Sequence, residues 1–116
     1  MANLNKIFKQ IDTVLEKDIE QYLCREVKKL SGTAYKFNSK NYASVPDRLC
    51  LFPGGRCYFV ECKKPGGVPT ARQKEELEKL TGLGFSARVI DTKGKVDQFI
   101  LEVKIDLEFN AIKKRL

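Results

Sequence analysis

Two carboxylates and a lysine are spaced so that a simple fold can bring them together. Asp47 precedes an apolar run over 48–52, and Glu61 and Lys63 follow a second apolar run over 57–60. A proline and two glycines separate the runs, which favours a tight turn and predicts a β-hairpin. Asp47 and Glu61 would then meet at the open end of that hairpin. Lys63 would lie on the same face as Glu61, because side chains alternate along a strand.

This grouping suits a divalent cation. Mg²⁺ prefers carboxylate, carbonyl and water oxygens, so Asp47, Glu61 and the main-chain carbonyl of Cys62 are the predicted ligands. Lys63 would position or deprotonate an attacking water and offset phosphate charge, as metal-assisted phosphodiester hydrolysis requires. An isolated Glu-x-Lys pair is usually a solvated salt bridge. Here Asp47 after Pro46, the hairpin, the preceding helix and the following βα segment favour a site. The chain has no histidine, which excludes histidine bases, Ser-His-Asp triads and His-ligated zinc.

A further carboxylate, Glu16, falls on the apolar stripe of the first predicted helix. An unpaired carboxylate there would be costly, which favours Glu16 as a site residue. It could instead complete a capping box that starts at Thr13. Glu20, one helical turn later, is the alternative ligand or a solvated helix residue.

The elements that must position these residues follow from hydrophobic spacing. The predicted helices cover residues 3–30 as one helix or two, a segment that Thr70 caps and that ends at Gly82 or Gly84, and a segment from Val96 onward. The predicted strands cover residues 34–37, 48–52, 57–60 and 85–90. The order is α-β-β-β-α-β-α, without repeats or a long linker, so we expect one domain over residues 1–116.

The composition narrows the class of partner. The 116 residues include 22 Lys plus Arg against 15 Asp plus Glu, a net charge of +7 that favours nucleic acid first and an acidic membrane surface second. No apolar run is long enough to span a membrane and the first residues lack a signal peptide's pattern, so we expect a cytoplasmic protein with no membrane partner. The four cysteines form no C-x-x-C pair and lie mostly in apolar runs, which predicts core residues in a reducing compartment.

Basic and aromatic side chains near these motifs are candidates for contacts to nucleic acid. As a set the basic residues would form a phosphate-contacting rim, although each one singly is more often a solvated charge. The rim candidates are Arg48, Arg56, Lys64, Arg72 and Lys74. The aromatic residues that could stack on unpaired bases are Tyr35, Phe37 and Tyr42, with core packing favoured for Phe37.

Taken together, these motifs resemble the VRR-NUC (virus-type replication-repair nuclease) family of the PD-(D/E)XK nuclease superfamily. The matching features are Ser44-Val45-Pro46-Asp47, Glu61-Cys62-Lys63, Gln73 on the following helix and Glu16 to Glu20 on the first. The resemblance covers residues 16 to about 100, and Ser44 stands where the family's G-x-P-D motif has glycine.

The resemblance implies an α/β fold with a restriction-endonuclease-like core, in which helices flank a mixed β-sheet. It also implies dependence on Mg²⁺ or Mn²⁺ and cleavage of branched or flap DNA. Under it Gln73 becomes a site residue that would hydrogen-bond a nucleotide phosphate or an active-site water, and Glu16 would bind a second ion or a water ligand.

These features favour a metal-dependent, structure-selective DNA endonuclease, and first of all a four-way (Holliday) junction resolvase. The family's stand-alone viral and bacterial members resemble dimeric resolvases, which implies a phage or bacterial origin and a homodimer. A two-fold symmetric junction needs two coordinated cuts, which a chain of 116 residues can supply only as a dimer. The alternatives are a flap or single-strand nuclease of the same fold, and a non-catalytic basic module that binds nucleic acid.

Overall fold

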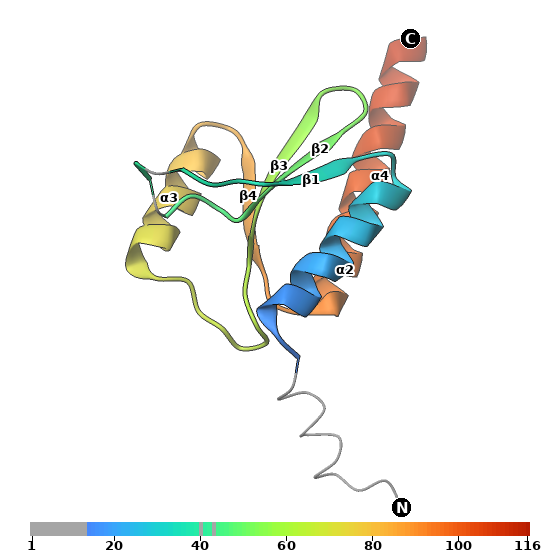
Figure 1. Cartoon of the computed structure of the whole chain (residues 1–116). Coiled ribbons are helices and arrows are strands. Elements are labelled where there is room, and N and C mark those ends of the chain that lie inside the picture. Colours follow the sequence, from blue (N-terminus) through green and yellow to red (C-terminus); the bar gives the residue numbers. More distant parts are fainter. Residues whose placement is uncertain (1–13, 40, 43) are drawn as a thin grey trace, which may run out of the picture.

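The computed structural model describes residues 14–39, 41–42 and 44–116. Its elements are α2 (Glu16–Lys29), β1 (Thr33–Lys36), β2 (Arg48–Phe52), β3 (Arg56–Cys62), α3 (Ala71–Gly82), β4 (Ser86–Ile90) and α4 (Lys93–Arg115) (Figure 1). The predicted order of elements is confirmed over this range. The part of the first predicted helix over 3–13, Thr13 included, lies outside the described residues.

The four strands form one mixed sheet in the order β1-β2-β3-β4. The first two pairs are antiparallel and β3 pairs with β4 in parallel, a connection for which α3 supplies the crossover. The predicted hairpin is present, with Arg48 opposite Val60 and Phe52 opposite Arg56. Gly54 in its turn has φ of 84°. This conformation favours glycine, because in other residues the Cβ atom would crowd a backbone carbonyl oxygen.

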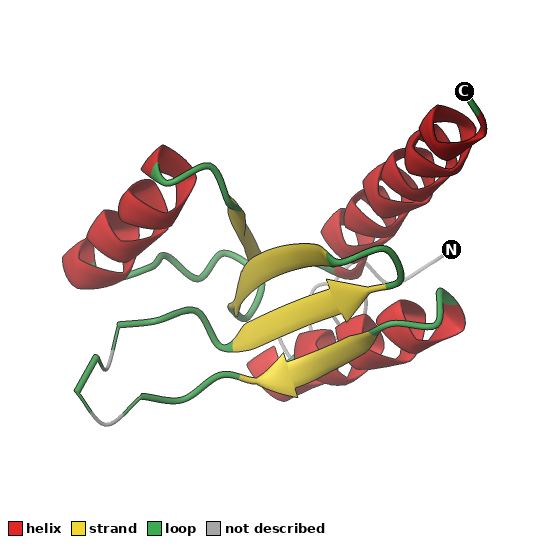
Figure 2. Ribbon diagram, turned by 90° about the horizontal axis from the view of Figure 1, so that it is seen from above, coloured by secondary structure: helices red, strands yellow, loops and turns green. Residues whose placement is uncertain are grey.

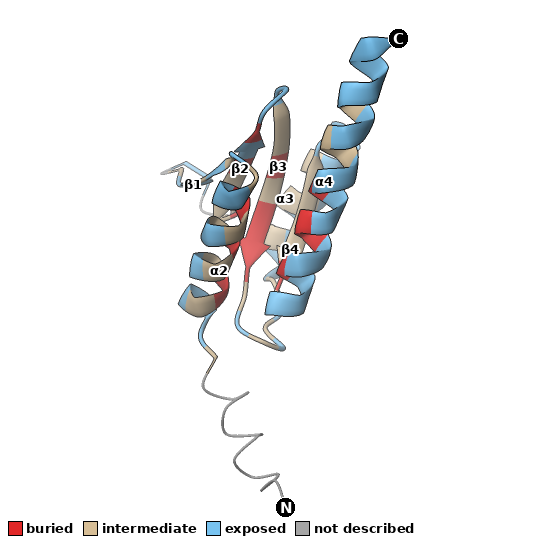
Figure 3. Ribbon diagram, turned by 90° about the vertical axis from the view of Figure 1, so that its right-hand side faces the viewer, coloured by how far each residue is buried: buried red, intermediate tan, exposed pale blue. Residues whose placement is uncertain are grey.

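Helices lie on both faces of the sheet. Figures 1 and 3 show α2 and α4 side by side on one face and α3 on the other, and Figure 2 shows the same layers from above. The core lies between the sheet and the two helices α2 and α4. Its buried residues are Ile19, Leu23, Val27, Cys50, Phe52, Tyr58, Val60, Cys62, Ile90, Val96, Phe99, Ile100 and Val103. Each large apolar side chain buried there contributes roughly 1.5–3 kcal/mol, which holds the strand ends in fixed positions.

The prediction that the cysteines are core residues is confirmed for two of the four. Cys50 and Cys62 are buried, Cys24 and Cys57 are half-buried, and all four are free thiols. Burial raises the pKa of Cys50 to about 12, so this thiol stays protonated and packs as a small apolar side chain.

Several boundaries differ from the predicted ones. The third strand continues to Cys62 because its parallel pairing with β4 extends to Cys62 opposite Ile90. The last helix begins at Lys93, since the Thr92 hydroxyl accepts a hydrogen bond from the Lys95 N–H at 3.0 Å and caps it. The first and last strands each begin one residue away from the predicted start. In the part of the chain that the structure describes, no helix is long and apolar enough to cross a membrane.

Candidate active site

Asp47 and Glu61 come together where β2 begins and β3 ends. The antiparallel register places residue 47 opposite residue 61. The Oδ2 atom of Asp47 accepts a hydrogen bond from the Cys62 N–H at 2.9 Å, and the preceding Pro46 is fully buried. The backbone of the third strand therefore fixes the position of the Asp47 carboxylate.

Glu61 is the one charged side chain that is buried among the described residues, with 2% of its surface exposed. The Nε2 atom of Gln73 donates a hydrogen bond to its Oε1 atom at 3.1 Å. The Lys63 ammonium lies 3.7 Å from the same oxygen. A buried carboxylate needs such partners, because an ionised group loses its hydration in the interior.

Gln73 reaches Glu61 from the first turn of α3, where it also closes a capping box. Its side-chain oxygen accepts a hydrogen bond from the Thr70 N–H at 2.9 Å, and its own N–H donates to the Thr70 hydroxyl at 3.2 Å. The side-chain oxygen of Gln73 is thus engaged by the helix cap, and its amide nitrogen faces the carboxylate. The structure brings Gln73 to the site as a partner of Glu61, whereas the sequence led us to expect a contact to phosphate or water.

The carboxylates influence one another's protonation. Burial raises the pKa of Glu61 to about 7; the nearby Asp47 charge acts in the same direction, and the Lys63 ammonium opposes it. Partial burial also raises the pKa of Glu16, again with Asp47 adding to the effect and Lys63 opposing it. Negative charge is therefore concentrated at the strand ends, an arrangement that a cation would relieve.

The donor set fits Mg²⁺ in type and number. Within residues 14–39, 41–42 and 44–116, no three Asp, Glu, Cys or His side chains lie close enough to hold a metal ion by themselves. Asp47 and Glu61 would supply two carboxylates beside the main-chain carbonyl of Cys62. Mg²⁺ is usually bound by one or two carboxylates, with waters and substrate phosphates completing its shell.

Glu16 is the first residue of α2 and lies beside an open hollow. The helix begins at Glu16, so this residue does not occupy the third helical position that a capping box requires. Asp18 takes a capping role instead, since its carboxylate accepts a hydrogen bond from the Leu15 N–H at 2.8 Å. The hollow has a volume of about 560 Å³, and Glu16, Lys63 and Lys64 contribute to its lining. The Glu16 carboxylate therefore shares this hollow with three lysines, the third being Lys17.

Arg48 and Glu20 pair with each other on the α2 face of the sheet. Arg48 Nε donates to Glu20 Oε1 at 3.3 Å and Arg48 Nη1 donates to the Ala34 carbonyl at 3.2 Å, with both charged side chains half-buried. The first residue of β2 points toward α2, so this guanidinium braces the helix against the sheet. Arg48 is thus engaged by Glu20 within the fold, and its place in a phosphate rim stays a prediction.

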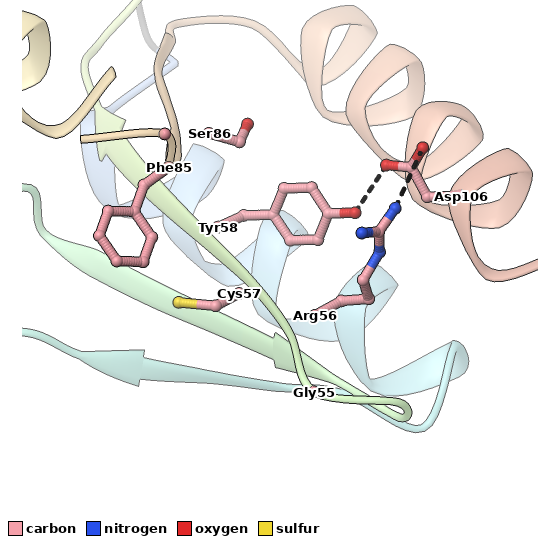
Figure 4. A pocket seen from close by; sticks show the side chains of 8 residues that line it. Gly55, Arg56, Cys57, Tyr58, Phe85, Ser86 and Asp106 are labelled. Atoms are coloured by element: carbon pink, nitrogen blue, oxygen red, sulfur yellow. Dashed lines mark hydrogen bonds and ion pairs between the residues drawn. The ribbon is translucent and has the colours of Figure 1, made fainter. Parts of the chain in front are cut away.

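Arg56 lies at the opposite end of β3 from Glu61, about 17 Å away at the rise of an extended strand. Figure 4 shows Arg56 and Tyr58 directed at Asp106 of α4, with Arg56 Nη2 at 3.5 Å and the tyrosine hydroxyl at 2.7 Å from its carboxylate. Arg56 therefore belongs to a cluster between the hairpin and α4, far from Glu61, and the structure does not bring it to the candidate site.

Lys64, Arg72 and Lys74 are exposed, the first just after the third strand and the other two on the first turn of α3. They remain the predicted rim.

The aromatic candidates divide as follows. Phe37 is half-buried and packs against Phe59 with ring centroids 6.0 Å apart, outside the main core. Tyr35 and Tyr42 are exposed. These two tyrosines remain the predicted stacking residues.

Sequence reasoning missed Asp91, which holds the loop after Lys63. Its carboxylate accepts a hydrogen bond from the Gly66 N–H at 3.3 Å and pairs with the Lys95 ammonium at 2.7 Å. The bond to Lys95 lowers the pKa of Asp91. A signal for Asp91 was available in the sequence, because this acidic residue directly follows the last predicted strand. That strand is parallel to β3, and parallel neighbours end at the same edge of the sheet.

No family model matches the sequence. The chain is 45% identical over 80 residues to "Putative nuclease p44" of Acyrthosiphon pisum secondary endosymbiont phage 1, a match that covers 69% of this chain and 86% of that protein. The fold of this chain is similar to a solved structure described as a VRR_NUC domain. The TM-score is 0.70 and the sequence identity is 27%, and the match covers 73% of this chain and 92% of that one. The mixed sheet with its flanking helices is thus of the restriction-endonuclease-like type.

Proposed function

Because this chain belongs to the VRR-NUC family of the PD-(D/E)XK nucleases, we propose that it is a nuclease that hydrolyses phosphodiester bonds in DNA. We further propose that the reaction depends on Mg²⁺, with Mn²⁺ as a substitute, and that cleavage occurs within strands of branched DNA. The preferred substrate in this proposal is a four-way junction, cut by a homodimer.

The observation that carries the proposal is the buried Glu61 carboxylate beside Asp47. Burial and a neighbouring like charge raise the pKa of Glu61 to about 7, so the ionised carboxylate does not stabilise the fold at this position. Groups perturbed in this way concentrate at functional sites. Lys63 and Gln73 hold Glu61 in place, as a positioned ligand requires.

The residues divide the work of hydrolysis. Asp47, Glu61 and the Cys62 carbonyl would hold the cation, and Glu16 would bind a water ligand or a second ion. When bound, the cation supplies polarisation of the scissile phosphate and a more acidic water. Lys63 orients the nucleophile at the strand end and offsets the phosphate charge. Lys64, Arg72 and Lys74 contact neighbouring phosphates from the loop and the start of α3.

The preference for a junction follows from charge and size. The net charge of +7 supplies affinity for phosphate but no base information. Selectivity must then come from the shape of the DNA and from two active sites held at a fixed separation. Two copies of the chain provide those sites, one in each protomer.

A substrate panel tests the proposal. Labelled four-way junction, 5′ flap, 3′ flap, linear duplex and single strand are incubated with the full chain in Mg²⁺, in Mn²⁺ and in EDTA. We expect the junction to be cut fastest, with internal products and no cleavage in EDTA. Cleavage of flaps in preference to junctions would refute the proposed substrate but support the nuclease activity. Binding without cleavage in either metal would overturn the proposal in favour of a binding module.

A further inference from the structure

The outer face of α4 carries an apolar stripe that nothing in the described chain covers. Its members lie three or four residues apart, which places them along one side of the helix. They are Leu101, Ile105, Phe109, Ile112 and Leu116, each between 55% and 101% exposed. The residues of α4 that pack into the core occupy the opposite side. Contiguous apolar surface of this kind marks an interaction site more often than a solvated face.

The second half of α4 also extends beyond the domain. Figures 1 and 3 show its C-terminal turns continuing past the edge of the sheet, and residues 111–116 are all exposed. A short stretch of helix without tertiary packing is marginal in water. The stripe therefore needs a partner that runs along it.

The charges beside the stripe match those of a second copy in reverse orientation. In an antiparallel pair around a two-fold axis, Leu101 lies opposite Ile112, Ile105 lies opposite Phe109, and each edge of the helix faces the same edge of its partner. Lys104 then lies near the partner's Glu108. The opposite edge brings Glu102, which also pairs with Arg88 at 2.6 Å in its own chain, near the partner's Lys113.

A parallel pair would be repulsive at its end. The last turn of α4 carries Lys113, Lys114 and Arg115, and parallel packing would place two such turns side by side. It would also align the two helix dipoles, whereas antiparallel packing opposes them. Charge complementarity thus selects the second copy as the occupant and sets its direction.

We propose that α4 packs antiparallel against α4 of a second copy through this stripe, and that this contact is the interface of the homodimer. The inference specifies the dimer named in the proposed function, but it does not depend on nuclease activity. Five large side chains from each copy, along roughly 22 Å of helix, provide a contact of the size class that specific interfaces occupy.

The mass of the full chain in solution tests the interface. Sedimentation equilibrium should give about twice the chain mass of 13.2 kDa. Replacing both Ile105→Glu and Phe109→Glu should halve that mass, because four buried charges would face each other. The matched control is Leu83→Glu, an exposed leucine of similar accessibility (65%, against 66% for Phe109) beyond the end of α3. Circular dichroism checks that each variant is folded.

Two results would overturn the interface. One is a wild-type chain that stays at 13.2 kDa at tens of micromolar; the other is a dimer that survives the double substitution. The nuclease proposal is judged separately, by cleavage of the substrate panel, so that a monomeric chain that still cuts DNA refutes the interface alone.

Oxidative cross-linking tests the direction of packing. Leu101→Cys and Ile112→Cys variants should form a mixed disulfide when combined, and neither should cross-link efficiently alone. The wild-type chain is run in parallel to account for its four native thiols. A Leu101→Cys variant that readily cross-links to itself would indicate parallel packing and refute the antiparallel pair.

Discussion

Glu61 combines burial, a nearby like charge, and a hydrogen bond and an ion pair on a single oxygen, and its properties lead to the first predictions. The side chain sits at the end of β3 with Gln73 at 3.1 Å and Lys63 at 3.7 Å. The neighbouring Asp47 is held by the Cys62 N–H. Neither carboxylate makes the kind of exposed salt bridge that contributes little to a protein.

Removing either carboxylate should remove catalysis but leave DNA binding. We expect Asp47→Asn and Glu61→Gln each to lower the cleavage rate by a factor on the order of 100 or more, because an amide is a poor ligand for a hard cation and cannot replace the charge. Junction affinity should stay the same or rise, since negative charge near phosphate is lost. Gel shift and cleavage assays measure the two quantities. Glu78→Gln, an exposed carboxylate on α3, is the control, and wild-type rates in the variants would contradict the assignment.

The metal-free protein should lose stability as the pH rises through neutrality. The folded pKa of Glu61, about 7, lies above the ordinary value of 4.5, so folding favours the protonated form. The stabilisation is complete below pH 4.5 and is lost by the time the pH passes 7, with a magnitude on the order of 3 kcal/mol at most. The lowered pKa of Asp91 affects only more acidic conditions.

Urea unfolding in EDTA at pH 5 and pH 8 measures this loss. Glu61→Gln carries no ionisable group at this position, so its stability should change less between the two pH values. Equal changes in the two proteins would mean that Glu61 titrates normally.

Lys63 should matter more for rate than for affinity. We expect Lys63→Ala to lower the cleavage rate far more than the junction affinity, because one phosphate contact among many carries a small share of the electrostatic binding energy. The matched control is Lys64→Ala, the adjacent exposed lysine. Single-turnover rates and titrations on the same junction separate the effects. An affinity loss that accounts for the whole rate loss would leave Lys63 as a phosphate contact only.

At the scale of elements, one side chain of α3 contacts both the N-terminal cap of the helix and the candidate active site. Gln73 closes the Thr70 capping box and donates to Glu61. The start of the helix and the position of the carboxylate are therefore coupled.

Removing this cap should destabilise the fold moderately and disturb the site. We expect Thr70→Ala to cost about 1 kcal/mol, the usual value for a lost N-cap. Gln73→Ala should lower the cleavage rate further, because it also leaves Glu61 without its amide donor. Thr81→Ala, near the end of the same helix, is the control, since its hydroxyl bonds only to the Leu77 carbonyl at 2.8 Å. A Gln73→Ala variant with no greater rate loss than Thr70→Ala would separate the helix cap from the site.

Local signals predicted the hairpin and the helix after Thr70, but tertiary pairing decided the rest. A proline and two glycines between apolar runs specify a turn by their own conformational limits, and Thr70 with Gln73 specifies a cap within four residues. The pairing of Arg48 with Glu20 joins two elements far apart in the chain, and no local spacing reveals it. The same holds for Arg56, whose partner Asp106 lies on the last helix.

The meeting of the site residues could be predicted from the hairpin. Once the register of the second and third strands is given, Asp47 and Glu61 must meet, and Lys63 follows. The burial of Glu61 and its bond to Gln73 could not be predicted, because they depend on how the crossover helix packs on the opposite face of the sheet.

At the scale of the whole molecule, binding should be governed by charge and selectivity by shape. The net charge of +7 predicts that junction affinity falls steeply with salt, because bound phosphates release counterions. The preference for junction over linear duplex should persist across the same salt range, since salt weakens the phosphate contacts of both substrates. Competition binding from 50 to 200 mM salt measures both quantities. A preference that disappears with the affinity would show that selectivity is only a matter of charge.

The start of α4 lies beside the site, because the Ile90 carbonyl accepts the Lys63 N–H at 3.0 Å and the helix follows at Lys93. In the antiparallel pair, the two sites would then sit at opposite ends of the paired helices, roughly 40 Å apart along their axis. This distance is somewhat longer than one turn of B-form DNA. The paired helices would act as a ruler that sets how far apart the two cut strands of a junction must lie.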